Sequence, residues 1–290
     1  MNNYIKKQIE TNKNINLLFK GLSDIVKINE DFKDNLLELK KKNIEISDQV
    51  LNDTIKNTLE RIYEINQFIN IDENGIAKLN KLYRNTYRMV NENNFNIILE
   101  KHFKNLSSII SNYYPERYKI KLHDIEKIGS VVNEQYSFNF QLKLFDFSIN
   151  ELNEPIIDIG CGSKAEFVRM LQLQGKDAFG IDRIINSETE KIIQTSWFDY
   201  HLFPESWGTI YSNMSFSNHF IYALKNDEKQ ISKYLQKYQE LLKALRNNGK
   251  FIYAPSLPEV EAALDTNQYE IKQIQMNSII SITKIKKIAI

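Results

Sequence analysis

The spacing of apolar residues divides the chain into a helical first part and a second part in which strands and helices alternate. Up to residue 110, apolar residues recur every three or four positions, as at Leu51, Ile55 and Leu59, which is the period of one helix face. This part contains no proline, and Asp72 precedes a helical pattern as an N-cap residue does. The pattern predicts helices over about residues 3–27, 31–43, 47–69, 73–91 and 93–112.

From residue 155 onward, short apolar runs predict strands over PIIDIG, DAFGID, IIQTSW, WGTIYSNMSF, KFIYAP, YEIKQIQM and SIISITKIKKIAI. Helices are predicted over AEFVRMLQLQ and ISKYLQKYQELLKALRNNG, the second one ending at Gly249. This alternation is typical of an α/β fold, in which helices cover both faces of a parallel sheet and ligands bind at the carboxyl ends of its strands. Between the two parts, YSFNFQLKLFDFSI (136–149) fits either a strand or an aromatic helix that covers the next domain.

Charge and composition exclude several classes of protein. The 38 Lys and Arg residues are balanced by 37 Asp and Glu residues, so we expect binding neither to DNA nor to a membrane. Because Cys161 is the only cysteine and the four histidines are scattered, the sequence predicts neither a disulfide nor a metal site. The first residues lack the apolar core of a signal peptide and no apolar run is long enough to span a membrane, so the expected location is the cytoplasm.

The segment that follows the first predicted strand has the pattern of a nucleotide-binding turn. Gly160 permits a tight turn, Gly162 lets the backbone approach a ligand, and the next helix points its N-terminal amides at that ligand. Asp182 ends the following strand 20 residues after Gly162, where a carboxylate can bind ribose hydroxyls. With Ala165, these glycines also fit the dinucleotide pattern G-x-G-x-x-A, which leaves a nicotinamide-dependent oxidoreductase as an alternative.

The acidic residue before this turn points to one family. Asp158 lies two residues before Gly160, and DIGCG resembles motif I of the class I S-adenosylmethionine-dependent methyltransferases. GID at Asp182, FDYHLFPESWGTIYSNMSFSNHF and YLQKYQELLKALRNNGKFIYAP resemble later segments of the same family, in the same order. The resemblance implies a Rossmann-like, mostly parallel sheet of seven strands with an antiparallel last strand, S-adenosylmethionine as the cofactor, and here an added all-α N-terminal domain.

The resemblance also implies roles for individual residues. Asp182 would bind the ribose, Asp199 the adenine amino group, and Asp158 would fix the glycine turn near the cationic methionine end of the cofactor. Lys164 would pair with the cofactor carboxylate unless it is simply solvated, and the Arg183 guanidinium would stack on adenine. The residues expected at the cofactor are Asp158, Gly160, Cys161, Gly162, Lys164, Asp182, Arg183, Asp199, Tyr200, Ser212 and Asn213.

Methyl transfer requires a nucleophile aligned with the sulfonium and, for a nucleophile of high pKa, a base. His219 is the first candidate base, with a structural role as the alternative, and Tyr211 is a second catalytic candidate. SNMSF lacks the [DNS]PP[YFW] tetrapeptide of DNA and RNA amino methyltransferases, and Cys161 lies within motif I rather than where a carbon-5 nucleophile is needed. The expected acceptor is therefore an oxygen or nitrogen of a small metabolite, such as one of specialised biosynthesis.

The expected domains are a helical N-terminal domain (1–115), a connecting segment (116–150) and a cofactor-binding domain (151–290). The helical domain would act as a lid, bind the acceptor or form a homodimer. A methyltransferase with a protein or RNA acceptor, and a non-catalytic helical interaction protein with a cofactor-binding-like domain, remain alternatives.

Overall fold

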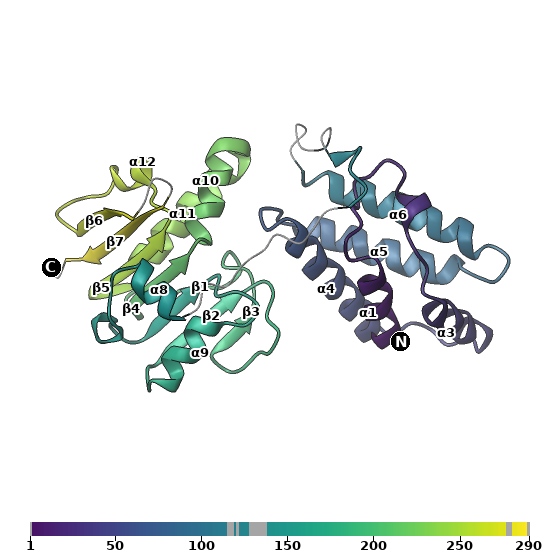
Figure 1. Ribbon diagram of the computed structural model, residues 1–290, viewed down its shortest axis with the longest axis horizontal. Coiled ribbons are helices and arrows are strands. Elements are labelled where there is room, and N and C mark those ends of the chain that lie inside the picture. Colours follow the sequence, from purple (N-terminus) through teal and green to yellow (C-terminus); the bar gives the residue numbers. More distant parts are fainter. Residues whose placement is uncertain (1, 115–118, 120–121, 128–137, 277–279, 289–290) are drawn as a thin grey trace. The chain divides into compact units, whose positions relative to one another are not determined.

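The chain forms two compact units, Met1–Val132 and Asn133–Ile290 (Figure 1). The computed structural model describes residues 2–114, 119, 122–127, 138–276 and 280–288. Each unit has hydrophobic core residues of its own, for example Leu36 and Leu99 in the first unit and Ile157 and Phe216 in the second. Two separately packed cores agree with the change of pattern along the sequence.

The described part of the first unit consists mainly of helices. They are α1 (Asn2–Thr11), α2 (Leu22–Ile25), α3 (Glu30–Lys41), α4 (Asp48–Ile65), α5 (Glu73–Met89) and α6 (Phe95–Ser111). Leu51, Ile55 and Ile62 are buried on one face of α4, as their spacing predicts. The Gly75 amide donates to the Asp72 carboxylate at 2.8 Å, so the predicted N-cap of α5 is confirmed.

The single helix predicted over residues 3–27 is wrong, because α1 ends at Thr11 and the chain turns back on itself. Asn12 stabilises this change of chain direction through its side chain. Its Nδ2 donates to the carbonyl oxygens of Gln8 and Lys27, and its Oδ1 accepts from the Lys27 amide at 2.8 Å. An Asn side chain that bonds the backbone in this way competes with continuation of the helix.

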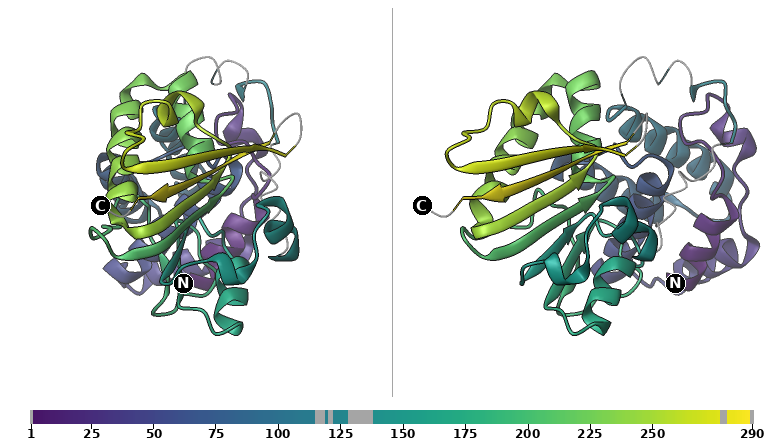
Figure 2. Two further views of the ribbon diagram at one scale, coloured as in Figure 1. Left: turned by 90° about the vertical axis from the view of Figure 1, so that its left-hand side faces the viewer. Right: turned by 60° about the vertical axis from the view of Figure 1, so that its left-hand side comes forward.

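The second unit is built on a seven-stranded sheet in the order β3-β2-β1-β4-β5-β7-β6 (Figure 2). The strands are β1 (Ile156–Ile159), β2 (Ala178–Asp182), β3 (Ile192–Gln194), β4 (Trp207–Asn213), β5 (Leu245–Ala254), β6 (Tyr269–Gln275) and β7 (Ser281–Lys287). Strands β1 to β5 pair in parallel, whereas β7 is antiparallel to both β5 and β6. The predicted Rossmann-like fold with an antiparallel last strand is confirmed.

Helices cover both faces of this sheet. The described ones are α8 (Phe138–Leu144), α9 (Glu166–Leu173), α10 (Phe216–Asn226), α11 (Glu228–Ala244) and α12 (Pro258–Glu261), with a 3-10 turn η1 (Ile149–Glu151). Ile156 packs in one core with α8 and α9, and Ile157 in another with α10 and α11. Because side chains alternate along a strand, Asp158 shares the α8 and α9 face with Ile156. Of the two interpretations of 136–149, the described residues 138–144 adopt the helix.

Two predicted boundaries are wrong. Gly249 does not end a helix, since α11 stops at Ala244 and Gly249 lies within β5. The register jumps there from Trp207 opposite Leu245 to Thr209 opposite Lys250, so β5 bulges. A Cβ on Gly249 would lie 2.8 Å from the Arg246 carbonyl oxygen and 3.0 Å from that of Trp207, which explains the need for glycine.

The strand predicted through Phe216 ends earlier, at Asn213, and the helix α10 was missed. Met214 has a positive φ of 50°, a backbone conformation that a continuing strand does not have. The Phe216 amide then donates to the Ser212 hydroxyl at 3.0 Å, a contact that fixes the start of α10. The side chains after β4 are therefore arranged by a helix.

Candidate functional site

Asp158 is a buried carboxylate at the carboxyl half of β1. Its neighbours across the strands are Gly180 on β2 and Tyr211 on β4, and it is only 4% exposed. Its Oδ1 atom is buried and has no hydrogen-bond partner among the described residues. Burial raises the pKa of Asp158 well above its ordinary value, and the nearby Asp182 raises it further. A cation placed at this carboxylate would lower the pKa of Asp158 and so oppose the effects of burial and of Asp182.

The glycine turn follows β1 directly. Gly160 and Gly162 have φ angles of 81° and 74°, which residues with a Cβ rarely adopt. The amides of Gly160 and Cys161 donate to the Ile181 carbonyl oxygen at 2.8 and 3.1 Å. A Cβ on Gly160 would lie 1.7 Å from the Ser215 hydroxyl oxygen, so the turn passes closely under the loop after β4. Both glycines are thus required by conformation, as predicted for Gly160, and Gly160 is also required by this contact. The approach of a ligand at Gly162 stays a prediction.

Asp182, at the end of β2, holds the turn from the other side. Its Oδ2 accepts from the Gly162 amide at 2.9 Å and its Oδ1 from the Ile184 amide at 3.0 Å. Burial raises the pKa of Asp182, and these hydrogen bonds oppose that rise. Each carboxylate oxygen has a second lone pair, so Asp182 keeps acceptor capacity for hydroxyl groups of a ligand.

Gln141 on α8 connects the helix layer to β4. Its Oε1 accepts from the Tyr211 hydroxyl at 2.9 Å and from the Asn213 amide nitrogen at 3.3 Å. Tyr211 is fully buried and its ring stacks on Phe167, with 4.4 Å between the ring centroids. Gln141 was not among the residues predicted from the sequence. A signal was present, because Gln141 lies three residues after Phe138 and four before Phe145, a helical spacing of apolar residues at which a polar residue needs a partner.

Trp197 and His219 form an aromatic pair beside the glycine turn. Their ring centroids are 4.9 Å apart in an edge-on arrangement, and a Cβ on Gly160 would lie 3.4 Å from the Trp197 ring. Burial lowers the pKa of His219 well below its ordinary value, and Arg183 lowers it further. The Arg183 guanidinium lies 6.0 Å from the centre of the Trp197 ring. Trp197 is a second residue that the sequence analysis missed.

The remaining predicted residues differ in exposure. Cys161 is buried beneath Gly180, and Ser212 bonds the Ile159 carbonyl oxygen at 2.9 Å, so both are parts of the local framework. Lys164 and Asp199 are exposed. The carbonyl oxygen of the half-buried Tyr200 accepts from the Lys237 ammonium at 2.8 Å. Their predicted contacts with a cofactor remain predictions.

Several buried polar atoms near the carboxyl ends of the central strands lack hydrogen-bond partners among the described residues. They are Asp158 Oδ1, Trp197 Nε1, Asn213 Oδ1 and Ser217 Oγ. Buried polar groups in proteins are normally paired. Acceptors on Asp158 and Asn213 and a donor on Trp197 therefore fit a polar ligand with a cationic end. In the same described ranges, no group of three acidic, histidine or cysteine side chains could hold a metal ion, and no helix is long and apolar enough to cross a membrane.

The strand order, the glycine turn after β1 and the acids on β1 and β2 define a class I methyltransferase fold. Solved structures similar to this chain include a SAM-dependent methyltransferase from Bacteroides fragilis in complex with S-adenosyl-L-homocysteine, with 16% identity, a TM-score of 0.40 and coverage of 56% of this chain and 84% of that chain. A second is the N-methyltransferase NodS from Bradyrhizobium japonicum, with 12% identity, a TM-score of 0.39 and coverage of 55% of this chain and 100% of that chain.

A third similar structure is the 1,6-didemethyltoxoflavin-N1-methyltransferase from Burkholderia thailandensis with bound 1,6-didemethyltoxoflavin and S-adenosylhomocysteine. It has 11% identity, a TM-score of 0.32 and coverage of 46% of this chain and 71% of that chain. No protein-family model and no curated protein matches the chain. The assignment of the fold therefore depends on the strand order and on the geometry of the turn.

Proposed function

We propose that this chain is an S-adenosylmethionine-dependent methyltransferase that acts on an oxygen or nitrogen of a small metabolite. The observation that carries the proposal is the buried, unpaired Oδ1 of Asp158 beneath a glycine turn. An unpaired buried carboxylate is costly unless a cation reaches it. A dinucleotide brings an anionic pyrophosphate to this turn, whereas the methionine end of S-adenosylmethionine brings a positive charge.

Each acid has a separate task in this proposal. Asp158 attracts the cationic end, and Asp182 accepts from ribose hydroxyls while it holds the Gly162 amide. Trp197 Nε1 and Asn213 Oδ1 offer one donor and one acceptor to the remaining polar groups. The cofactor, when bound, supplies the methyl group on a sulfonium. The protein contributes alignment of the acceptor and exclusion of water.

The binding part of the proposal is tested by calorimetry with S-adenosylhomocysteine and with NAD. We expect saturable binding of S-adenosylhomocysteine that weakens by about 10- to 150-fold in Asp182→Ala, since a hydrogen bond to a charged group contributes about 1.5–3 kcal/mol. Binding of NAD alone would contradict the proposal and support the oxidoreductase. Unchanged affinity in a folded Asp182→Ala variant would remove Asp182 from the ribose site.

The acceptor class is tested by incubating the protein with methyl-labelled S-adenosylmethionine and fractions of a cell extract. We expect label in the small-molecule fraction. Label confined to RNA or to protein would replace the proposed acceptor. Absence of label from every fraction, together with cofactor binding, would support a non-catalytic interaction protein instead.

A further inference from the structure

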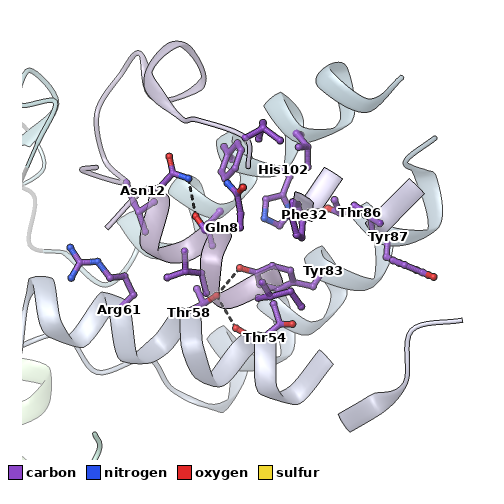
Figure 3. A pocket seen from close by; sticks show the side chains of 18 of the residues that line it. Gln8, Asn12, Phe32, Thr54, Thr58, Arg61, Tyr83, Thr86, Tyr87 and His102 are labelled. Atoms are coloured by element: carbon purple, nitrogen blue, oxygen red, sulfur yellow. Dashed lines mark hydrogen bonds between the residues drawn. The ribbon is translucent and has the colours of Figure 1, made fainter. Parts of the chain in front are cut away.

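The helical unit contains a cavity of about 160 Å³, formed entirely within residues 5–106 (Figure 3). Side chains from α1, α3, α4, α5 and α6 line it, and most of them are apolar. Leu51, Leu36 and Leu99 lie in its wall and are almost completely buried, whereas Ile9, Ile28 and Phe32 are partly exposed, so the cavity extends from the interior of this unit toward its surface. Well-packed interiors contain few voids larger than one water molecule.

The hydroxyl groups of the cavity wall form hydrogen bonds within the protein. The Thr58 and Tyr83 hydroxyls are 2.8 Å apart, and the Thr86 hydroxyl lies 2.8 Å from His102 Nδ1. Figure 3 shows the Thr58 and Tyr83 side chains meeting at one side of the cavity. Thr54 uses its hydroxyl within its own helix, to the Val50 carbonyl oxygen at 2.7 Å. These hydroxyl groups and the His102 Nδ1 are therefore satisfied in the absence of polar groups from a ligand.

The titratable side chains of His102 and Arg61 place no charge at the centre of the cavity. Burial lowers the pKa of His102 to about 4, so its ring is uncharged at neutral pH. Arg61 also lines the cavity, but its Nη1 pairs with Glu64 at 2.9 Å. Figure 3 shows the Arg61 guanidinium pointing away from Tyr83 and His102. A charged ligand group would lose its hydration here without gaining a counter-charge at the centre.

Aromatic rings make up a further part of the wall. The Tyr83 and His102 ring centroids are 4.9 Å apart, and those of His102 and Phe103 are 5.4 Å apart with a nearly perpendicular arrangement. Phe32 lines the same space. Such rings attract the edge or the face of another aromatic ring. An engineered apolar cavity of about 150 Å³ holds one benzene molecule, so the volume here suits a ligand of that size.

We propose that this cavity is a binding site for one uncharged aromatic ring, either a free monocyclic compound or the apolar end of a larger metabolite. The occupant is defined by the volume of the cavity, by the aromatic wall and by the lack, among the described residues, of an available charge at its centre. The site lies wholly within the helical unit and does not depend on the proposed methyl transfer. Its occupancy would give this unit a ligand-dependent stability of its own.

The experiment uses the full chain with labelled isoleucine and leucine methyl groups, titrated with benzene and followed by NMR. We expect saturable shifts at the methyl groups of Ile9 and Leu51, which line the cavity, and no shifts at Ile97, which is 69% exposed on α6, or at Ile157 of the sheet. Benzoate, the charged counterpart, is expected to cause no saturable shift. Shifts spread over surface methyl groups, equal binding of benzoate, or no saturation with benzene would overturn the proposal.

Two matched variants locate the site. Ile9→Trp fills the cavity from α1 and should weaken benzene binding at least tenfold, while Ile97→Trp adds the same side chain to the exposed surface of α6 and should leave it unchanged. Equal affinity in both folded variants would place the ligand elsewhere. S-adenosylhomocysteine binding, measured on the same samples, reports separately on the second unit. If Ile9→Trp does not fold, the methyl shifts of the unmodified protein still decide the question.

Discussion

Replacing Asp158 by asparagine removes a buried charge while preserving the shape of the side chain. The Asp158 side chain is 4% exposed and its Oδ1 has no partner among the described residues. Its pKa is raised in the fold, so as pH increases the unfolded chain loses this proton before the folded chain does. Folding stability therefore falls as pH rises through the window between the two pKa values, by about 1.4 kcal/mol for each unit that separates them.

Asp158→Asn should remove this loss, because asparagine carries no charge at any of these pH values. The ligand-free variant should then be at least as stable as the unmodified protein at pH 7. Cofactor affinity should change in the opposite direction. Loss of a charged contact contributing about 1.5–3 kcal/mol weakens S-adenosylhomocysteine binding by about 10- to 150-fold. The two effects together distinguish a ligand-binding charge from a structural one.

The assays are urea unfolding between pH 4 and 8 and calorimetric titration with S-adenosylhomocysteine. Asp265→Asn is the matched control, since it removes the same charge from an exposed turn between α12 and β6 and should alter neither quantity by much. An Asp158→Asn variant that binds as tightly as the unmodified protein would refute the role of this carboxylate. So would a large loss of stability at pH 7, because the charge would then stabilise the empty fold.

Three further predictions concern the turn, the helical unit and α8. Gly160→Ala should destabilise the second unit more than Gly175→Ala in thermal melts. A positive φ costs alanine roughly 1–2 kcal/mol at either position, but only at Gly160 would the new Cβ meet a neighbour, the Ser215 hydroxyl oxygen at 1.7 Å. Equal losses of stability would contradict the close contact with Ser215. His102 binds a proton below about pH 6.5 in the unfolded chain but only near pH 4 in the folded chain. The free energy of unfolding should therefore fall by about 3 kcal/mol as pH is lowered from 6.5 to 4. In urea melts, His102→Gln should show a weaker dependence of this free energy on pH. Gln141→Leu should cost about 1–3 kcal/mol by leaving buried groups of β4 unpaired, whereas Asn139→Leu on the exposed side of α8 should not.

The sheet and its glycine turn were predictable because short-range patterns determine them. A buried apolar run fixes β1, positive φ angles require Gly160 and Gly162, and an acid ends the next strand at Asp182. Each of these features follows from the conformation or burial of a few consecutive residues. The number of strands and the antiparallel direction of the last one came from the resemblance to a family, and the structure agrees with both.

The wrong boundaries share a different cause, which is contact between residues distant in sequence. Asn12 ends α1 through the backbone of Lys27, and α11 gives way to β5 before Gly249 because Leu245 and Lys250 pair with Trp207 and Thr209 of β4. Helical periodicity alone contains no information on either contact, and tertiary packing overrides local propensity at such points. The same reason explains the absence of Gln141 from the predicted site, since its partners lie about 70 residues further along the chain.

The helix missed after β4 changes the expected chemistry most. A loop after β4 would have presented His219 at the open edge of the sheet, but α10 turns it inward, where it is 5% exposed and packs edge-on against Trp197. Its lowered pKa keeps the ring neutral and makes it a weak base. The hydroxyl of Tyr211, the second candidate, is bonded to Gln141. Both catalytic roles remain predictions.

Because both candidates are buried, we expect the proposed methyl transfer to depend on alignment rather than on proton removal, and to use an acceptor that is already nucleophilic, such as a neutral nitrogen. His219→Gln should then retain turnover within about tenfold, less than the factor that a general base contributes. The pH dependence of the rate should follow the pKa of the acceptor in both proteins. A loss of about a hundredfold or more, with a shifted pH profile in a variant that still binds S-adenosylhomocysteine, would instead establish His219 as the base and favour an acceptor hydroxyl.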